Sequence, residues 1–318
     1  MPLRFIAAFT LLVSTFAAHA AAVDTLLGEW TDAARSNRVV PYKIYVPQGA
    51  TAPAPVVIFS HGLGGNRDGA VYLLNHLAEN GYVAVAVQHP GSDTKAVFPG
   101  GTVNQAGLRD AISPGAAADR FRDIPFAIDE LTTMNANDAR LKGRMDMSKV
   151  GLSGHSYGAI TTLALAGQGF GPGGGFSFAD DRLKAAIAYS PSKPRQGDPA
   201  QVFSGIRMPT FHMTGTRDEN PLDPSEPAAN RIVPYRSIAN GDKYLIVFEG
   251  GDHMIFSGRS FQGGPRPQDP RFHAWIQKAS LAFWDTYLRG NAEAKTYLTG
   301  GKFAAELAGE GTYEFQTR

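Results

Sequence analysis

Hydrophobic and polar positions along the chain follow two patterns, one typical of strands and one typical of helices. Short apolar or alternating runs predict strands at residues 39–46, 56–59, 82–87, 150–152, 185–189, 210–213 and 244–248. Apolar residues spaced three and four apart predict helices at 66–80, from about 121 onward, at 157–166 and, as a final helix, at 272–288. Strands separated by helices require crossover connections. We therefore expect a doubly wound α/β domain with a mostly parallel central sheet and helices on both faces.

Boundary residues sharpen this expectation. Asn66 is a suitable N-cap for the first helix, and Gly81 suits the position just past its end. Because proline is tolerated only in the first turn of a helix, Pro125 implies that the second helix begins close to Asp123. Long loop-rich segments at 167–181 and 219–233 follow strand ends, where open α/β sheets bind ligands. No interdomain linker is evident, so we expect one domain, 21–318, with loop insertions. The segment 167–181 is either a lid or pocket wall, or a surface loop.

The first twenty residues have the pattern of a signal peptide. Arg4 gives a positive start, residues 5–17 are apolar, and Ala18-His19-Ala20 fits the small-x-small cleavage pattern. The apolar run is shorter than the ~20 residues that a spanning helix needs, although an uncleaved anchor is the alternative. We therefore expect export to the periplasm or the medium, with cleavage after Ala20 or, alternatively, Ala22. No later segment has the length and apolarity of a membrane span.

Composition excludes several classes of function. The formal net charge is +1, and removal of residues 1–20, whose only charged residue is Arg4, leaves 29 basic and 29 acidic residues. This balance gives no reason to expect a nucleic-acid partner. The absence of cysteine excludes disulfides, thiolate metal sites and a cysteine nucleophile. No histidine and carboxylate cluster has ligand spacing, so neither a metal nor another cofactor is expected.

One short motif carries nucleophile chemistry. Gly154-His155-Ser156-Tyr157-Gly158 is a G-x-S-x-G sequence that lies between a predicted buried strand and an alanine-rich helix. This context suits a tight strand-to-helix turn that exposes the serine, with glycines preventing clashes as the turn closes. The helix N-terminus also places partial positive charge beside a developing oxyanion. The alternative is a glycine-rich turn with an incidental serine. Ser156 is therefore the candidate nucleophile.

The chain resembles the α/β-hydrolase superfamily at this motif. Together with Phe59-Ser60-His61-Gly62-Leu63-Gly64-Gly65, the motif is similar to the platelet-activating-factor acetylhydrolase and dienelactone-hydrolase-like branch. The general pattern covers residues 39–288. Dienelactone hydrolases use a cysteine nucleophile, which this chain lacks. The resemblance therefore implies hydrolysis of carboxylic esters, small or lipid-like, rather than dienelactone hydrolysis.

In this fold the catalytic acid precedes the histidine along the chain. Of the three histidines after Ser156, His212 lies within a strand pattern and His273 begins a helix, whereas His253 follows a strand end through Gly-Gly-Asp. The resemblance places the general base at the same Gly-Asp-His segment. Asp218, on the loop after the preceding strand, is the candidate acid that orients the imidazole. The rival carboxylates are those of Glu219, Asp223 and Asp252.

The oxyanion hole needs two backbone N–H groups. One belongs to Tyr157, after the nucleophile, and the resemblance assigns the other to Leu63, in a glycine-rich segment that lets the backbone approach a substrate. Gly62, His89 and His155 are candidate substrate-binding residues, although a structural role is open for them. His61 is expected to orient the loop.

Two further hypotheses remain open at this point. The same three side chains would serve an amide or peptide hydrolase, which matched ester and amide substrates would distinguish. A non-catalytic relative that acts as a binding protein is the other alternative, although the complete Ser, Asp and His set weighs against it.

Overall fold

The computed structural model describes residues 22–223, 225–258 and 266–318. The expected signal peptide, 1–20, lies outside these ranges. The strands are β1 (Val23–Asp32), β2 (Arg38–Pro47), β3 (Ala54–Ser60), β4 (Val83–Val87), β5 (Met145–His155), β6 (Gly169–Phe170), β7 (Phe176–Ser177), β8 (Leu183–Tyr189), β9 (Thr210–Arg217), β10 (Lys243–Asp252) and β11 (Gly311–Gln316). The helices are α1 (Val71–Glu79), α2 (Thr94–Val97), α3 (Gln105–Ala111), α4 (Pro114–Asn137), α5 (Tyr157–Ala166), α6 (Pro199–Val202), α7 (Val233–Ser237), α8 (Asp269–Leu288), α9 (Ala292–Thr299) and α10 (Lys302–Leu307). Short 3₁₀ helices span Ala33–Arg35, Pro99–Gly101, Pro172–Gly174 and Ala228–Ile232.

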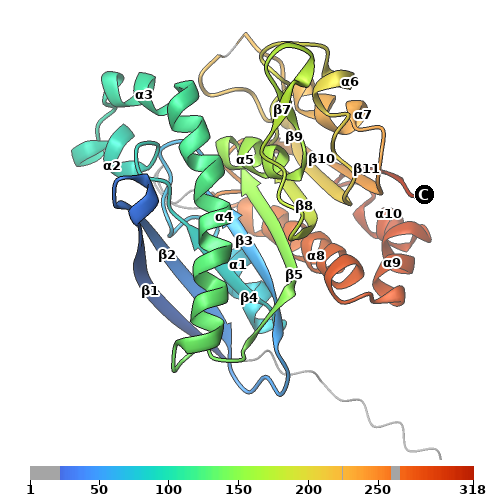
Figure 1. Ribbon diagram of the computed structural model, residues 1–318. Helices are drawn as coiled ribbons and strands as arrows, with labels where there is room; N and C mark the ends of the chain where they lie inside the picture. Colours follow the sequence, from blue (N-terminus) through green and yellow to red (C-terminus); the bar gives the residue numbers. More distant parts are fainter. Residues whose placement is uncertain (1–21, 224, 259–265) are drawn as a thin grey trace, which may run out of the picture.

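The central element is a mixed sheet that, within the described residues, has nine strands in the order β1-β2-β4-β3-β5-β8-β9-β10-β11. The six strands from β4 to β10 in this order are parallel, whereas β1, β2 and β11 run antiparallel to their neighbours. Consecutive parallel strands are connected through helices that cross over the sheet (Figure 1). The predicted doubly wound α/β fold is confirmed.

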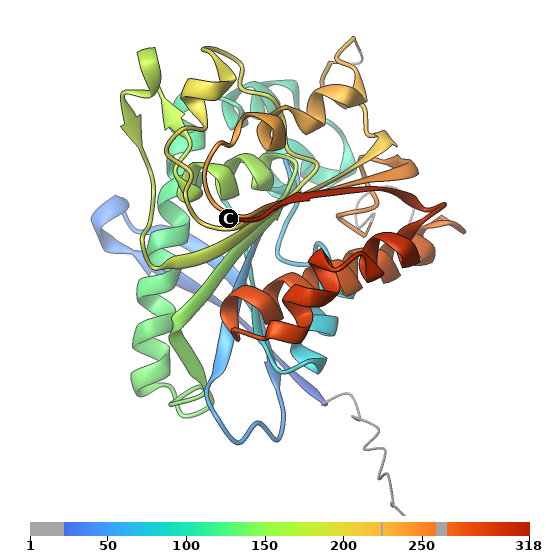
Figure 2. The ribbon, with the colours of Figure 1, turned by 90° about the vertical axis from the view of Figure 1, so that its right-hand side faces the viewer.

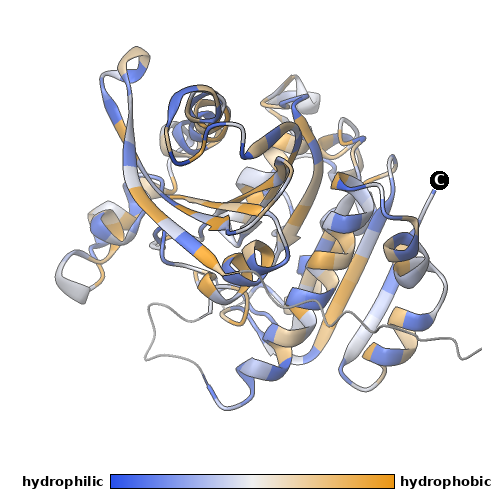
Figure 3. Cartoon of the chain, turned by 90° about the horizontal axis from the view of Figure 1, so that it is seen from below, coloured by the Kyte–Doolittle hydropathy of each residue, from blue (hydrophilic) through white to orange (hydrophobic). Residues whose placement is uncertain are grey.

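Helices cover the sheet on both faces. Helices α1 and α8 pack on one face, and α4 and α5 pack on the other (Figure 2). The inner strands are buried on both sides: all seven residues of β3 and all five of β4 are buried. Figure 3 shows long hydrophobic stretches in strands of the sheet, and helices in which hydrophobic and hydrophilic residues alternate. Burial of both faces explains why these strands have continuous apolar runs instead of an alternating pattern.

The first helix is shorter than the sequence pattern predicts, because α1 begins at Val71 and not near Asn66. The side chain of Asn66 accepts a hydrogen bond from the backbone N–H of Asp68, which forms a local turn instead of a helix cap. Ala70 then adopts a left-handed conformation, with φ of 55°. Gly81, with φ of 81°, does lie just past the helix, as predicted.

Helix α4 begins nine residues earlier than the position of Pro125 suggests. Ser113 caps its N-terminus by accepting a hydrogen bond from the N–H of Ala116, and Pro114 occupies the first turn. Pro125 lies inside the helix, where it removes one backbone hydrogen bond at a typical cost of ~3 kcal/mol. The extra turns carry the buried polar residues Arg120 and Asp123.

The C-terminal part of the chain continues beyond the predicted final helix. Helices α9 and α10 follow α8, and β11 pairs antiparallel with β10 over residues 243–248. Segment 167–181 forms the small β6–β7 hairpin, in which Phe170 and Phe178 pack on Phe121 of α4. Within the described residues, no helix combines the length and apolarity needed to cross a bilayer.

Candidate active site

Ser156 lies at the tip of a strained turn between β5 and α5. Its φ of 57° and ψ of −113° are unusual for a residue with a side chain, which is the strained geometry expected for a nucleophile at such a turn. The flanking glycines are required by contact. A Cβ atom on Gly154 would lie 2.3 Å from the carbonyl oxygen of Gly158, and one on Gly158 would lie 1.8 Å from that of Ser60. The turn therefore packs directly on the end of β3.

The structure brings Ser156, His253 and Asp218 together at the carboxyl edge of the sheet. Nε2 of His253 lies 2.9 Å from Oγ of Ser156, and Nδ1 of His253 lies 2.7 Å from Oδ1 of Asp218. Each residue directly follows a parallel strand: Ser156 follows β5, Asp218 follows β9 and His253 follows β10. Because these strands all end at one edge, three side chains distant in sequence form a continuous chain of hydrogen bonds.

Asp218 is fully buried and ionised in this environment. Thr214 Oγ1 donates a hydrogen bond of 2.7 Å to its Oδ2, and Ser190 Oγ donates one of 2.8 Å to its Oδ1. Burial by itself raises the pKa of the Asp218 carboxyl. The hydrogen bond from His253 and the positive charge of Arg231 contribute to outweighing burial, so the pKa of Asp218 lies below its usual value. The carboxylate can thus accept the Nδ1–H of His253.

The rival carboxylates lie elsewhere. Asp252 accepts a hydrogen bond from the N–H of Met254 and forms an ion pair with Arg266. Asp223 accepts hydrogen bonds from the backbone and side chain of Ser225. Glu219 is exposed. Of the carboxylates considered from the sequence, Asp218 is the one in contact with His253.

Ser190 is a site residue that sequence reasoning missed. It follows β8, the strand between β5 and β9, and has a φ of 53°. Its Oγ lies 2.8 Å from both Oδ1 of Asp218 and Nδ1 of His253, and its N–H donates to the carbonyl of Met213. Ser190 directly follows the strand predicted at residues 185–189, which is the one indication that the sequence offers. Because no recognisable motif surrounds this serine, the sequence did not distinguish it from other serines.

Arg231 was also missed. It comes from the 3₁₀ helix within the long segment 219–233, and its side chain is only 5% exposed. Nε lies 3.3 Å from Oδ1 of Asp218, and the guanidinium donates to the backbone carbonyls of Asp218 and Glu219 at 3.2 Å. The length of this segment indicated function, but nothing in the sequence singled out this arginine.

Leu63 and Tyr157 supply the candidate oxyanion donors. Tyr157 is the first residue of α5, so its N–H has no partner within the helix. Neither this N–H nor that of Leu63 makes a hydrogen bond within residues 22–223, 225–258 and 266–318. Gly62 approaches the nucleophile: a Cβ atom there would lie 3.4 Å from Cβ of Ser156. The two amides are therefore available to an oxygen atom of a bound substrate.

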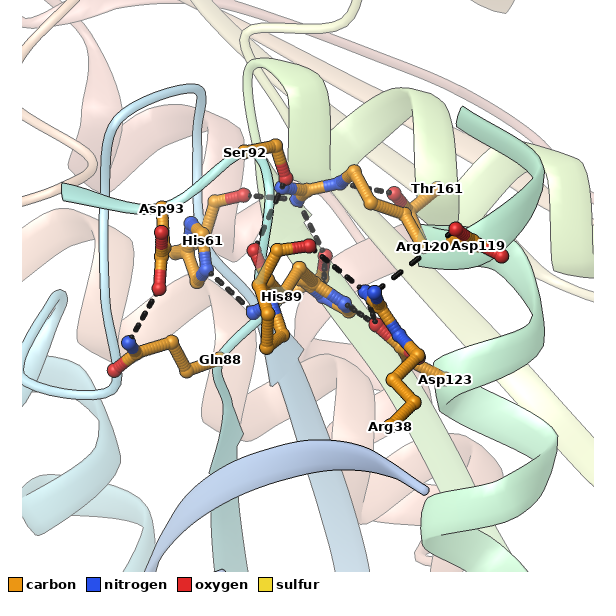
Figure 4. A network of polar contacts seen from close by, with 12 residues as sticks. Arg38, His61, Gln88, His89, Ser92, Asp93, Asp119, Arg120, Asp123 and Thr161 are labelled. Atoms are coloured by element: carbon orange, nitrogen blue, oxygen red, sulfur yellow. Dashed lines mark hydrogen bonds and ion pairs between the residues drawn. The ribbon is translucent and has the colours of Figure 1, made fainter. Parts of the chain in front are cut away.

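His89 and His155, candidates for substrate binding, lie instead behind the site. His89 is fully buried, and its Nδ1 donates to Asp123 at 2.9 Å while its Nε2 accepts from Ser60 Oγ at 2.9 Å (Figure 4). His155 is 3% exposed, and its Nε2 donates to the backbone carbonyl of His253 at 2.8 Å. Burial lowers the pKa of His89 to about 4 and that of His155 to about 3, so both rings are neutral. They support the loops that carry the reacting groups.

His61 orients the glycine-rich loop, as expected. Its Nε2 accepts a hydrogen bond of 3.0 Å from the backbone N–H of His89, and its Nδ1 donates to the carbonyl of Gly62 at 2.6 Å. Of the other two histidines that follow Ser156 in the sequence, His212 is buried in β9, and His273 is half-buried and stacks on Tyr72 at 3.7 Å. In the described part of the chain, no three histidine or carboxylate side chains are grouped as metal ligands.

The sequence is similar to platelet-activating factor acetylhydrolases. The family model described as platelet-activating factor acetylhydrolase, isoform II, matches residues 14–99. The chain is 26% identical over 284 residues to platelet-activating factor acetylhydrolase of Cavia porcellus, which covers 78% of this chain and 61% of that protein. For the enzyme of the same name in Canis lupus familiaris the identity is 22%, over 66% of this chain and 49% of that protein. The matches thus span between about half and three fifths of these relatives.

The fold is also shared with a solved esterase. A ferulic acid esterase from Streptomyces cinnamoneus superposes with a TM-score of 0.63 over 88% of this chain and 93% of that chain, at 21% identity. This match shows that the chain has the α/β-hydrolase fold. The predicted resemblance to platelet-activating-factor acetylhydrolases is confirmed.

Proposed function

We propose that this protein is a serine hydrolase that cleaves carboxylic esters through an acyl-enzyme intermediate on Ser156. One observation carries the proposal: the hydrogen-bonded chain from Oγ of Ser156 through His253 to Asp218, with lengths of 2.9 and 2.7 Å. Nucleophile, base and orienting acid within hydrogen-bond reach are what nucleophilic acyl transfer requires. The similarity to enzymes of ester hydrolysis supports the choice of substrate class.

In the first half of the reaction, Oγ of Ser156 attacks the ester carbonyl carbon as Nε2 of His253 takes its proton. The carbonyl oxygen becomes an oxyanion held by the N–H groups of Leu63 and Tyr157. Asp218, which accepts the Nδ1–H, stabilises the imidazolium formed at His253. The tetrahedral intermediate then collapses, the bond to the leaving oxygen breaks, and Nε2 gives its proton to the departing alcohol. Ser156 is left acylated.

In the second half, water replaces the alcohol. Nε2 of His253 removes a proton from water as the hydroxide oxygen attacks the acyl carbon, and the same two N–H groups hold the new oxyanion. Collapse of this intermediate breaks the bond to Oγ, which recovers its proton from Nε2. A carboxylic acid leaves, and Ser156 is restored. The strained turn keeps Oγ in one place through both halves.

The proposed substrates are small or lipid-like esters with a short acyl group. The curated relatives are named for the acetyl group of platelet-activating factor, and the solved structure is named for ferulic acid. Acetyl, longer acyl and feruloyl esters therefore form the series to compare. We also propose that residues 1–20 direct export and are removed, which mass spectrometry of the N-terminus of the mature protein would test.

The decisive experiment compares the wild-type protein with Ser156→Ala. Wild-type protein is expected to hydrolyse p-nitrophenyl acetate and to be labelled by a fluorophosphonate at Ser156, whereas the variant is expected to do neither while keeping its circular dichroism spectrum. Wild-type-like turnover by the variant would overturn the proposal. Absence of hydrolysis and labelling in the wild type would favour a binding protein, and preference for a matched amide would favour a peptidase.

A further inference from the structure

Arg120 is a buried cation that is held by neutral oxygens. It is fully buried on α4, and its guanidinium donates hydrogen bonds of 2.8 Å to Ser92 Oγ, 3.0 Å to Ser60 Oγ and 3.3 Å to Thr161 Oγ1 (Figure 4). It also donates to the backbone carbonyl of His61. Within the described residues, no carboxylate forms an ion pair with it at 4.0 Å or less. Burial lowers the pKa of Arg120 to about 10, so the group is charged at neutral pH.

A buried charge without a counter-ion is costly, so its location matters. The carbonyl of His61 belongs to the peptide that leads into Gly62 and Leu63, which is one half of the oxyanion hole. The ring of Tyr157, whose N–H forms the other half, lies against the guanidinium, with 4.4 Å between ring centroid and Cζ. Thr161, one turn further along α5, links Arg120 to the backbone of Tyr157. Its hydroxyl accepts a hydrogen bond from Arg120 and donates one to the carbonyl of Tyr157 at 3.2 Å. One side chain thus contacts both halves.

The two halves also meet directly, which makes their spacing sensitive to this side chain. The backbone of Gly158 packs against the carbonyl of Ser60 so closely that a Cβ atom would lie 1.8 Å away. Arg120 lies beside this contact and donates to Ser60 Oγ on one side and Thr161 on the other. Movement of its guanidinium would shift β3 and α5 relative to each other.

A second Asp-His-Ser arrangement fixes one acceptor of Arg120, the hydroxyl of Ser60. Asp123 accepts from Nδ1 of His89 at 2.9 Å, and Nε2 of His89 accepts from Oγ of Ser60 at 2.9 Å. Arg38 donates two hydrogen bonds, of 2.8 and 2.9 Å, to Asp123. The order of hydrogen bonds, from serine through histidine to aspartate, is the same as that at Ser156. Ser60, His89 and Asp123 are all 0% exposed, however, so Ser60 cannot contact a substrate. Its hydroxyl is committed to His89, which leaves its oxygen as an acceptor for Arg120.

We propose that Arg120 is a positioning residue of the oxyanion hole, which holds the Leu63 and Tyr157 amides at the spacing that an oxyanion requires. The inference rests on the proposed function, since it concerns the same reaction. Arg120 acts through the backbone and touches no substrate atom. Its loss is expected to weaken binding of the transition state more than binding of the ester.

The test compares Arg120→Lys and Arg120→Met with a control, Arg144→Met. Lysine keeps the charge but cannot reach all four oxygens, so it isolates the geometric contribution. Arg144 donates to the carbonyl of Pro47 at the opposite, amino edge of the sheet. With p-nitrophenyl acetate, both Arg120 variants are expected to lose about 10- to 100-fold in kcat, with KM changed by less than about threefold, whereas the control keeps kcat within about twofold. The rate of fluorophosphonate labelling should fall in parallel.

Several outcomes would overturn the inference. Wild-type kcat in Arg120→Lys, or a loss confined to KM, would contradict a role in positioning the two amides. If both Arg120 variants fail to fold by circular dichroism, Thr161→Val replaces them as a nearly isosteric change in the same contacts; it is expected to lose about 3- to 10-fold in kcat with KM unchanged, and full activity would be equally contradictory. Wild-type protein without Ser156-dependent hydrolysis would overturn the proposed function, whereas active wild type with active Arg120→Lys would overturn this inference alone.

Discussion

Arg231 lies against the ring of His253, with 3.3 Å between Nη2 and Nδ1, while its Nε lies 3.3 Å from Oδ1 of Asp218. The same guanidinium donates to the backbone carbonyls of Asp218 and Glu219. The loop after β9 is therefore held at its backbone and at its carboxylate by one side chain. This contact fixes the direction from which the carboxylate approaches the imidazole.

Replacement of Arg231 by Met is expected to lower kcat for p-nitrophenyl acetate by about 10- to 100-fold, because small displacements of reacting groups are costly. The loop that carries Asp218 would lose its two backbone contacts and its charge partner. Arg236→Met is the matched control, since Arg236 is half-exposed and forms an ion pair with Glu314. Equal kcat in Arg231→Met and the control would show that the loop needs no support.

Removal of the hydroxyl of Ser190 is expected to lower both stability and kcat. Asp218 would lose a hydrogen bond at a buried carboxylate, which typically contributes about 1.5–3 kcal/mol. Because φ at this position is 53°, glycine is tolerated by the backbone better than alanine. Ser190→Gly and Ser190→Ala should therefore show a similar loss of kcat. In urea unfolding, the free energy of unfolding should fall less in Ser190→Gly than in Ser190→Ala. Full activity in both variants would show that the hydroxyl is dispensable.

The strain at Ser156 predicts a difference between two inactive variants. Ser156→Ala keeps a side chain at φ of 57°, whereas Ser156→Gly relieves the strain. Backbone strain of this kind is typically about 1–3 kcal/mol, part of which glycine loses again through its greater freedom in the unfolded chain. Ser156→Gly is expected to have the higher Tm of the two by calorimetry. A Tm below that of Ser156→Ala would show an unstrained turn.

The contact at Gly158 predicts a steric effect. A methyl group there would lie 1.8 Å from the carbonyl oxygen of Ser60, so Gly158→Ala is expected to separate β3 from α5 and abolish hydrolysis. Gly115, in the first turn of α4, has no atom within 4 Å of an added Cβ. Gly115→Ala, the control, should keep wild-type activity. Hydrolysis at the wild-type rate in Gly158→Ala would contradict the tight packing of Gly158 on Ser60.

Burial of His212 is expected to make the stability of the protein depend on pH. Burial lowers its pKa to about 3 in the folded state, against about 6.5 in the unfolded chain. Below pH 6.5 the unfolded state binds the additional proton, so the free energy of unfolding falls as the pH is lowered from 6.5 toward 3, by about 1.4 kcal/mol per pH unit. His212→Gln should show a shallower fall than wild type in urea titrations between pH 7 and 5. Parallel curves would contradict a neutral buried imidazole.

Much of the fold could be predicted because its inner strands are buried on both faces and therefore have continuous apolar runs. Helix α5 was predicted at its observed bounds, since glycines enclose the turn before it. The start of α4 was missed because burial of Phe121 and Ile124 and the cap at Ser113 outweigh the local cost of Pro125. Strand β11 was missed because it is an edge strand whose residues are mainly exposed or half-buried.

The three residues of the hydrogen-bonded chain could be predicted because each follows a recognisable strand in a fixed order. Arg120, Ser190 and Arg231 could not, because each acts through tertiary contacts that leave no local pattern. Arg120 lies in the part of α4 that precedes the predicted start of this helix near Asp123, and Arg231 lies in a segment without periodicity. Sequence patterns record strand ends and turns, whereas a buried guanidinium is recognised only by the oxygens that surround it.

The pairing of β11 with β10 has a consequence for the general base. His253 follows β10, and β10 has neighbours on both sides only when residues 311–316 are in place. Without β11, the strand that leads into His253 would be an open edge of the sheet. Loss of this pairing is thus expected to loosen the imidazole, although no residue of β11 is part of the hydrogen-bonded chain.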